Sequence, residues 1–150
     1  MKTDEQWMLL AIEEAKKAKP RGDWPFGAVV IKDGNIIGRG HARDKSDGDV
    51  TDHAELIAVR DACRNVQSND LGGCAIYCTN EPCTMCAAGI FQANIDHVYI
   101  GASRDDLSRL LRPRTLRIEH VAEDAGYTIH IVKGILKDEV LELFKDIHKG

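Results

Sequence analysis

The chain has 150 residues, of which 43% are hydrophobic and 29% charged, and its net charge is −4. These values are typical of a single globular domain over residues 1–150 and exclude a disordered or fibrous protein. The acidic balance argues against a general nucleic-acid binder, which usually carries a basic surplus. Five cysteines without a disulfide pattern, no secretion signal and no membrane-length apolar run predict a cytoplasmic protein with no membrane partner.

Apolar residues recur at helical spacing in some segments and form short β-rich runs in others. In chain order these patterns predict a helix over 4–19, a β-hairpin over 26–41, a loop over 43–51, a helix over 52–66, a strand over 74–79, a helix over 82–93, a strand over 97–102, one or two short helices within 103–126, a strand over 127–132 and a closing amphipathic helix over 136–147. Thr3 and Gln6 read as a capping box. Asp33-Gly34 is the hairpin turn, and Pro82 suits the first turn of its helix.

The order of the predicted elements indicates the fold class. The later strands alternate with helices, which implies parallel pairing because parallel strands need crossover connections. The early hairpin adds an antiparallel edge. The sequence therefore predicts an α/β fold: a three-layer α-β-α sandwich with a mixed five-stranded sheet, an N-terminal hairpin and helices on both faces.

Two of the predicted helices begin with residues that bind metal ions. The first begins with His53 and Glu55, and the second with Cys83 and Cys86. Cysteines at i and i+3 lie on one helical face and can bind one ion, and a helix N-terminus favours the thiolate. With His53 they make three protein ligands, the number found in catalytic zinc sites, where water takes the fourth position.

Glu55 distinguishes between the possible roles of this cluster. It lies two positions from His53, so we expect it to face the water and to move protons to a substrate nitrogen. A lone C-x-x-C could instead be a redox pair, and the cluster could be a structural zinc site or a binding module without activity. H-x-E followed by P-C-x-x-C is more specific, since it is the signature of zinc deaminases that act on nucleobases.

The chain resembles the cytidine/deoxycytidylate deaminase superfamily in PFGAVVIKDGNIIGRGH (25–41), TDHAELIAVRDA (51–62) and TNEPCTMCAAGI (79–90). It is similar to the compact branch with guanine deaminase, fungal-type cytosine deaminase and tRNA adenosine deaminase. The resemblance implies a cytidine deaminase-like fold, one Zn²⁺ per subunit, a homodimer and hydrolytic release of ammonia. It also implies that Glu55 is the catalytic proton carrier and that the Cys83 backbone N–H steadies the attacking oxygen.

The resemblance also indicates the substrate pocket. The stretch from Trp24 to Gly27 is similar to the guanine deaminase version, in which the phenylalanine matching Phe26 lines the base pocket. The residues that we expect to bind substrate are Trp24, Phe26, His41, Asp52 and Ala54. Packing roles for Trp24 and His41, and a helix N-cap role for Asp52, are the alternatives.

Two features bear on the choice of substrate. Ala42 stands where the family commonly has an asparagine that hydrogen-bonds the substrate, so the pocket should discriminate differently among bases. Residues 103–119 contain five arginines and three acids, which could be surface ion pairs or a clamp for phosphate or carboxylate. We expect a free guanine- or cytosine-like base or a related N-heterocycle, with adenosine in tRNA, or a nucleoside or nucleotide, as the alternatives.

Overall fold

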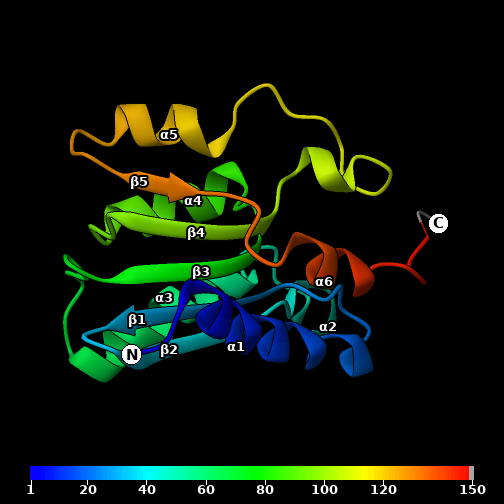
Figure 1. Ribbon diagram of the computed structural model, residues 1–150, viewed down its shortest axis with the longest axis horizontal. Coiled ribbons are helices and arrows are strands. Elements are labelled where there is room, and N and C mark those ends of the chain that lie inside the picture. The colour runs from blue at the N-terminus through cyan, green and yellow to red at the C-terminus, as the bar shows by residue number, and fades with distance from the viewer. Residues whose placement is uncertain (149–150) are drawn as a thin grey trace.

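The structure is a computed structural model that describes residues 1–148, and its centre is a five-stranded mixed sheet (Figure 1). The strands are β1 (Gly27–Lys32), β2 (Asn35–His41), β3 (Ala75–Asn80), β4 (His97–Ala102) and β5 (His130–Val132). Their spatial order is β2-β1-β3-β4-β5. β1 pairs antiparallel with both β2 and β3, whereas β3, β4 and β5 are parallel. The expected mixed sheet with an antiparallel hairpin at one edge is confirmed.

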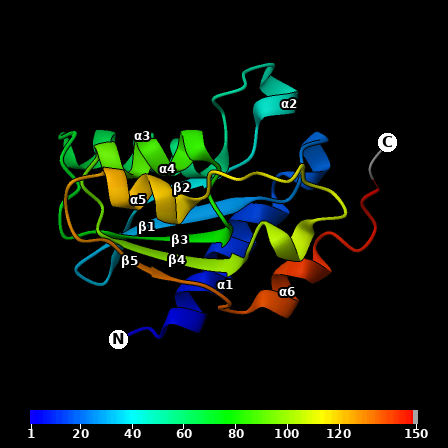
Figure 2. The ribbon, with the colours of Figure 1, turned by 90° about the horizontal axis from the view of Figure 1, so that it is seen from above.

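Helices cover both faces of this sheet, which confirms the three-layer fold (Figure 2). The helices are α1 (Asp4–Lys16), α2 (Asp44–Asp47), α3 (Ala54–Val66), α4 (Thr84–Gln92), α5 (Ile118–Asp124) and α6 (Lys137–Glu142), with 3-10 turns η1 (Lys19–Arg21) and η2 (Asp105–Leu107). α1 and α6 pack on one face, and α3, α4 and α5 on the other. None of the helices in residues 1–148 combines the length and the apolar character of a membrane span.

Two local predictions are wrong. The expected loop over 43–51 contains α2, because the buried carboxylate of Asp23 accepts hydrogen bonds from the backbone N–H groups of Lys45 and Ser46 at 2.9 and 3.0 Å. Pro82 lies before α4 rather than in its first turn, since the helix begins at Thr84. The remaining predicted helices and strands are present, with ends that shift by a few residues.

Close contact between α3 and the hairpin fixes where the helix begins. A Cβ atom on Gly40 would lie 2.3 Å from the carbonyl oxygen of Ala54, and one on Gly38 would lie 2.3 Å from that of Ala58. Only glycine therefore allows the helix to approach β2 this closely. This contact holds the N-terminus of α3 over the end of the sheet.

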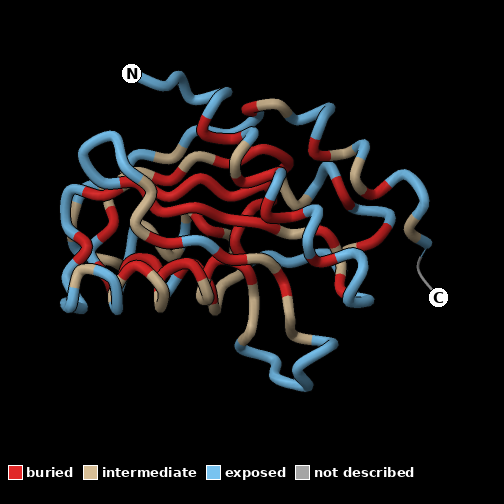
Figure 3. The backbone as a smooth tube through the Cα atoms, turned by 90° about the horizontal axis from the view of Figure 1, so that it is seen from below, coloured by how far each residue is buried: buried red, intermediate tan, exposed pale blue. Residues whose placement is uncertain are grey.

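The starts of α3 and α4 meet at the edge where β3 and β4 end. β2 and β3 are both antiparallel to β1, and β3 is parallel to β4, so the carboxyl ends of β2, β3 and β4 lie at the same edge. α3 is the main helix after β2 and α4 follows β3. The central strands β1, β3 and β4 are largely buried, while the segment that holds α2 projects beyond the sheet and is largely exposed (Figure 3). The carboxyl edge of an open α/β sheet is the usual place for a ligand site.

Candidate active site

Three side chains from the starts of α3 and α4 form a metal-ligand cluster. His53 and Cys83 are the N-cap residues of these helices, and Cys86 lies in the first turn of α4. His53 Nδ1 is 3.6 Å from the Cys83 sulfur and 3.4 Å from the Cys86 sulfur. Tetrahedral zinc with ordinary Zn–N and Zn–S bonds places such atoms about 3.5 Å apart. The donor types and their spacing therefore fit zinc.

The cluster also has the charge that a cation needs. Hydrogen bonds with Cys86 and His53 outweigh burial and lower the pKa of the Cys83 thiol to about 4, while the hydrogen bond with Cys83 and burial raise the pKa of Cys86. One thiolate is therefore present at neutral pH even before a metal binds. Within residues 1–148 no further histidine, cysteine or carboxylate joins these three, so the protein supplies three of four tetrahedral ligands.

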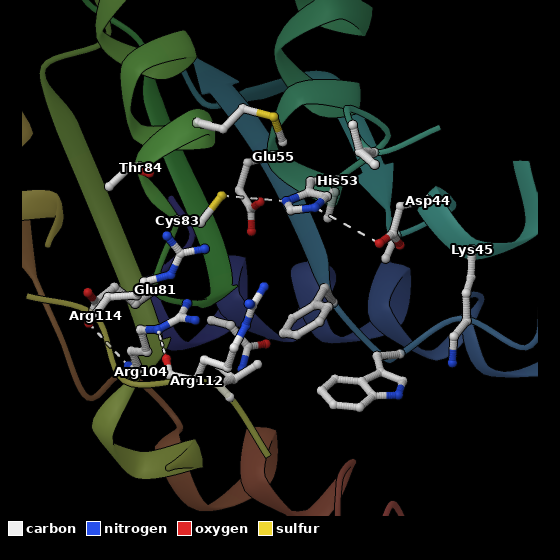
Figure 4. Close-up of a pocket in the computed structure, with 18 residues that line it drawn as sticks. Asp44, Lys45, His53, Glu55, Glu81, Cys83, Thr84, Arg104, Arg112 and Arg114 are labelled. Atoms are coloured by element: carbon white, nitrogen blue, oxygen red, sulfur yellow. Dashed lines mark hydrogen bonds and ion pairs between the residues drawn. The ribbon is translucent and has the colours of Figure 1, made fainter. Parts of the chain in front are cut away.

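Glu55 lies beside the cluster in the first turn of α3, with 5% of its surface exposed. Burial and the nearby Cys83 charge raise its pKa. Figure 4 shows its carboxylate pointing into the cavity next to Cys83 and His53. A raised pKa makes a buried carboxyl group better able to take up a proton and pass it on.

Asp44 lies on the opposite side of the His53 ring. Its Oδ2 atom is 4.0 Å from His53 Nε2, while Nδ1 faces the two sulfurs (Figure 4). A carboxylate here favours the tautomer with hydrogen on Nε2, which leaves the Nδ1 lone pair for a metal. The sequence did not predict this residue, because α2 itself was expected to be a loop.

A cavity of about 560 Å³ opens beside Glu55 at the end of the sheet. This volume is within the usual range of small-molecule sites. Three of the predicted substrate-binding residues, Trp24, Phe26 and Ala54, line the cavity. The Trp24 and Phe26 ring centroids are 6.3 Å apart, so the two rings form an aromatic wall against which a planar base can pack.

The other two predicted substrate-binding residues lie elsewhere. His41 does not line the cavity, because its side chain points to the α1 face, where Nδ1 is 3.4 Å from Glu14 Oε2. Asp52 also lies outside the cavity, and its carboxylate accepts a 2.6 Å hydrogen bond from Arg60. The N-cap role considered for Asp52 is wrong as well, since His53 holds that position.

The arginines of residues 103–119 divide into two groups. Arg109 and Arg117 hold the segment in place: Arg109 donates to the carbonyls of Phe144 and Ile147, and Arg117 makes a bidentate pair with buried Glu81 at 2.7 and 2.8 Å.

The second group, Arg104, Arg112 and Arg114, lines the cavity (Figure 4). Within residues 1–148 none of the three forms an ion pair with a carboxylate. Burial and the charge of Arg114 lower the pKa of Arg104, as expected where cations crowd together. The group therefore gives the cavity a rim of positive charge.

One further cavity residue was not predicted from the sequence. Asn80, the last residue of β3, is 3% exposed, and its Nδ2 atom has no hydrogen-bond partner among the described residues. Its place directly before Glu81-Pro82-Cys83 in the chain is the only signal that could have indicated it.

Known proteins share both the motif and the fold. Residues 1–102 match the family model for the cytidine and deoxycytidylate deaminase zinc-binding region. A tRNA-specific adenosine deaminase of Bacillus subtilis is 34% identical over 145 residues, covering 93% of this chain and 84% of that protein. Alignments with two other tRNA-specific adenosine deaminases span 65% and 63% of those proteins.

Two solved structures extend this likeness. One, from a study of A-to-I editing by tRNA:A34 deaminases, has a TM-score of 0.80 and 34% identity, covering 92% of this chain and 98% of that one. The other, guanine deaminase from Bacillus subtilis, has a TM-score of 0.68 and 34% identity, covering 71% and 69%. The chain therefore belongs to the zinc-binding cytidine and deoxycytidylate deaminase family, and it is a hydrolytic C–N deaminase.

Proposed function

We propose that this protein deaminates adenosine in transfer RNA to inosine. The observation that carries the proposal is the rim formed by Arg104, Arg112 and Arg114, which faces the cavity without carboxylate partners in residues 1–148. Arginine binds phosphate with charge-assisted hydrogen bonds, and a nucleotide within RNA brings a phosphate on each side of its base. The relatives named as tRNA deaminases support the same substrate class.

We place RNA ahead of the free base expected from the sequence for two reasons. A cavity of about 560 Å³ can take a base together with part of its ribose and phosphate. The acidic net charge that argued against nucleic acid is a property of the whole chain, whereas binding depends on the local arginine rim.

His53, Cys83 and Cys86 would hold the zinc ion, which when bound supplies the nucleophile by polarising water at neutral pH. Glu55 would take one proton from the attacking water and deliver it to the ring nitrogen next to the attacked carbon. It would then take the proton of the newly formed hydroxyl group and deliver it to the exocyclic amine, which leaves as ammonia while the carbon becomes a carbonyl. The backbone N–H of Cys83, the N-cap residue of α4, would donate to the attacking oxygen.

The aromatic wall and the rim would hold the substrate for this reaction. Trp24 and Phe26 pack against the flipped-out base, and Ala54 lies beside Glu55 at the start of α3. Stacking on aromatic rings is the usual way in which an unpaired RNA base is bound. We also expect a cytoplasmic homodimer of one deaminase domain per chain, with one zinc ion per subunit.

A free base is the second candidate. Ala42 lines the cavity at the position where a family asparagine would contact the substrate, and the guanine deaminase of Bacillus subtilis is 34% identical. Phe26 gives the same kind of wall to guanine as to adenine. Only an assay distinguishes the two substrates.

The test is a comparison of substrates with the zinc-loaded protein. Inosine formation is measured in an anticodon stem-loop with adenosine at the wobble position, and ammonia release is measured with guanine, cytosine, isocytosine and adenosine. We expect inosine in the stem-loop and little ammonia from the free compounds. Ammonia release from a free base, together with no inosine formation in the stem-loop, would contradict the RNA proposal and support the second candidate.

A further inference from the structure

Three cavity-lining residues at the ends of adjacent strands, here called the floor of the cavity, are Phe26 before β1, Ala42 after β2 and Asn80 at the end of β3. The backbone N–H of Ala42 donates to the carbonyl of Phe26 at 3.0 Å, which places these residues side by side across the hairpin. The antiparallel register that pairs Ala28 with Cys78, continued by two residues through Gly27 and Thr79, puts Phe26 opposite Asn80. All three line the cavity, so a base bound there can contact them.

Asn80 is the only one of these three side chains that can form hydrogen bonds. Ala42 contributes a methyl group and Phe26 a ring, whereas Asn80 carries an amide and is 3% exposed. Its Oδ1 atom accepts a 2.8 Å hydrogen bond from the hydroxyl of Thr79, and that hydroxyl in turn accepts from the backbone N–H of Gly27 at 3.0 Å. This chain of hydrogen bonds turns the oxygen of the amide toward Thr79.

The NH₂ group of Asn80 is therefore left without a protein partner. Its Nδ2 atom is buried and makes no hydrogen bond within residues 1–148. An unpaired buried donor costs free energy, and a protein keeps one where a ligand supplies the acceptor. The position of Asn80 in the cavity floor gives that ligand a place.

We infer that Asn80 is a specificity-determining residue whose Nδ2 donates a hydrogen bond to an acceptor on the edge of the substrate base. In a purine that Glu55 protonates at N1, the remaining ring acceptors are N3 and N7. With Ala42 unable to form a hydrogen bond, base recognition in the floor moves from the end of β2 to the end of β3. The inference rests on deamination of a base at this site, and the choice of purine follows from the proposed function.

The sharpest variant is Asn80→Asp. It keeps the oxygen that the Thr79 hydroxyl needs and replaces only the donor, so the fold and the zinc content should be unchanged. Asn80→Ala removes both atoms. Asn65→Asp is the matched control, because this residue donates to the Ile37 carbonyl at 2.7 Å and does not line the cavity.

These variants are assayed with the adenosine stem-loop and with its 3-deaza and 7-deaza forms. We expect Asn80→Asp and Asn80→Ala to lower kcat/KM on the adenosine stem-loop about 10- to 100-fold. The deaza substrate that lacks the acceptor should show a similarly lower kcat/KM with the wild type. Asn80→Ala should not lower kcat/KM on that substrate any further, because both changes remove the same hydrogen bond. Asn65→Asp should retain wild-type kcat/KM.

Unchanged kcat/KM in Asn80→Asp would overturn the inference. Equal further losses on every substrate in Asn80→Ala would also overturn it, because they would indicate a packing role. If the wild type forms no inosine in the stem-loop, the proposed function is wrong, but this result does not decide the role of Asn80. The same comparison then uses guanine with 7-deazaguanine, because N3 of guanine is the ring nitrogen that Glu55 would protonate. Unchanged kcat/KM in Asn80→Asp again overturns the inference.

Discussion

The three metal-ligating side chains hold one another in place. Each sulfur is within 3.6 Å of the imidazole of His53, so the loss of one ligand removes a bond and loosens the others. We predict that the wild type binds about one equivalent of zinc and that Cys86→Ala binds almost none, since two ligands rarely hold zinc tightly. Zinc per chain is measured by elemental analysis after dialysis.

Cys74→Ala is the matched control for this experiment. Cys74 is also buried, but it lies outside the metal-ligand cluster. It should keep the full equivalent of zinc, although it loses some packing. Full zinc in Cys86→Ala would show that the cluster is not the binding site.

The spacing of residues in the sequence predicted the metal ligands better than it predicted the residues that line the pocket. His53, Cys83 and Cys86 carry a motif that local helix geometry turns into one site. His41 was misassigned because residues alternate along a strand: Gly40 faces α3, so His41 faces the opposite side. Asn80 could not be predicted, since its role depends on which strands lie beside β3.

The close contact between α3 and β2 sets the position of the active site. A Cβ atom on Gly40 would lie 2.3 Å from the Ala54 carbonyl oxygen and must push the start of α3 away. We predict that Gly40→Ala destabilises the protein by about 1–3 kcal/mol. Zinc affinity should fall as well, because His53 lies next to the displaced residue. Thermal unfolding and a chelator competition measure the two effects.

Gly72→Ala is the control for Gly40→Ala. The nearest atom to its added Cβ is the side-chain oxygen of Asp70 at 3.1 Å, which can move. Its stability should change little and its zinc affinity not at all. Equal behaviour of the two variants would contradict the role given to the α3–β2 contact.

Glu81 anchors the arginine-rich segment to the end of β3. Its side chain is 2% exposed, and it accepts hydrogen bonds from Arg117 and from the backbone N–H of Arg104. We predict that Glu81→Gln lowers the free energy of unfolding by about 3 kcal/mol, because it leaves Arg117 with an incomplete partner. Urea denaturation measures this loss.

Glu13→Gln provides the comparison for Glu81→Gln. Glu13 pairs with Lys16 on an exposed surface of α1, so its loss should cost less than about 1 kcal/mol. Similar losses in the two variants would contradict the anchoring role of Glu81.

Helices and strands with clear hydrophobic periodicity could be predicted from the sequence, and they are the elements of the sheet and its main helices. The exceptions depend on distant residues. α2 forms because Asp23, more than twenty residues earlier in the chain, binds its N-terminus. The segment before α5 is irregular and is held by the ion pair between Arg117 and Glu81, which no local pattern encodes.

Charge is distributed unevenly at the scale of the whole molecule. The chain has a net charge of −4, yet Arg104, Arg112 and Arg114 face one cavity. If these residues bind RNA phosphates, KM for the stem-loop should rise with salt concentration, by roughly 0.7 log units per contact and tenfold change in salt. The double variant Arg112→Ala/Arg114→Ala should lower the slope of log KM against log salt concentration by about 1–2.

Steady-state kinetics between low and high salt test this prediction. A stem-loop KM that does not depend on salt would contradict the role given to the arginine rim.

Glu55 carries the protons in the proposed mechanism, and one variant tests this role directly. Glu55→Gln keeps the size and burial of the side chain but removes its ability to carry protons. We predict that the variant binds about one equivalent of zinc, folds as the wild type does, and loses ammonia release by at least about 100-fold. Full activity in zinc-loaded Glu55→Gln would contradict the proposed mechanism.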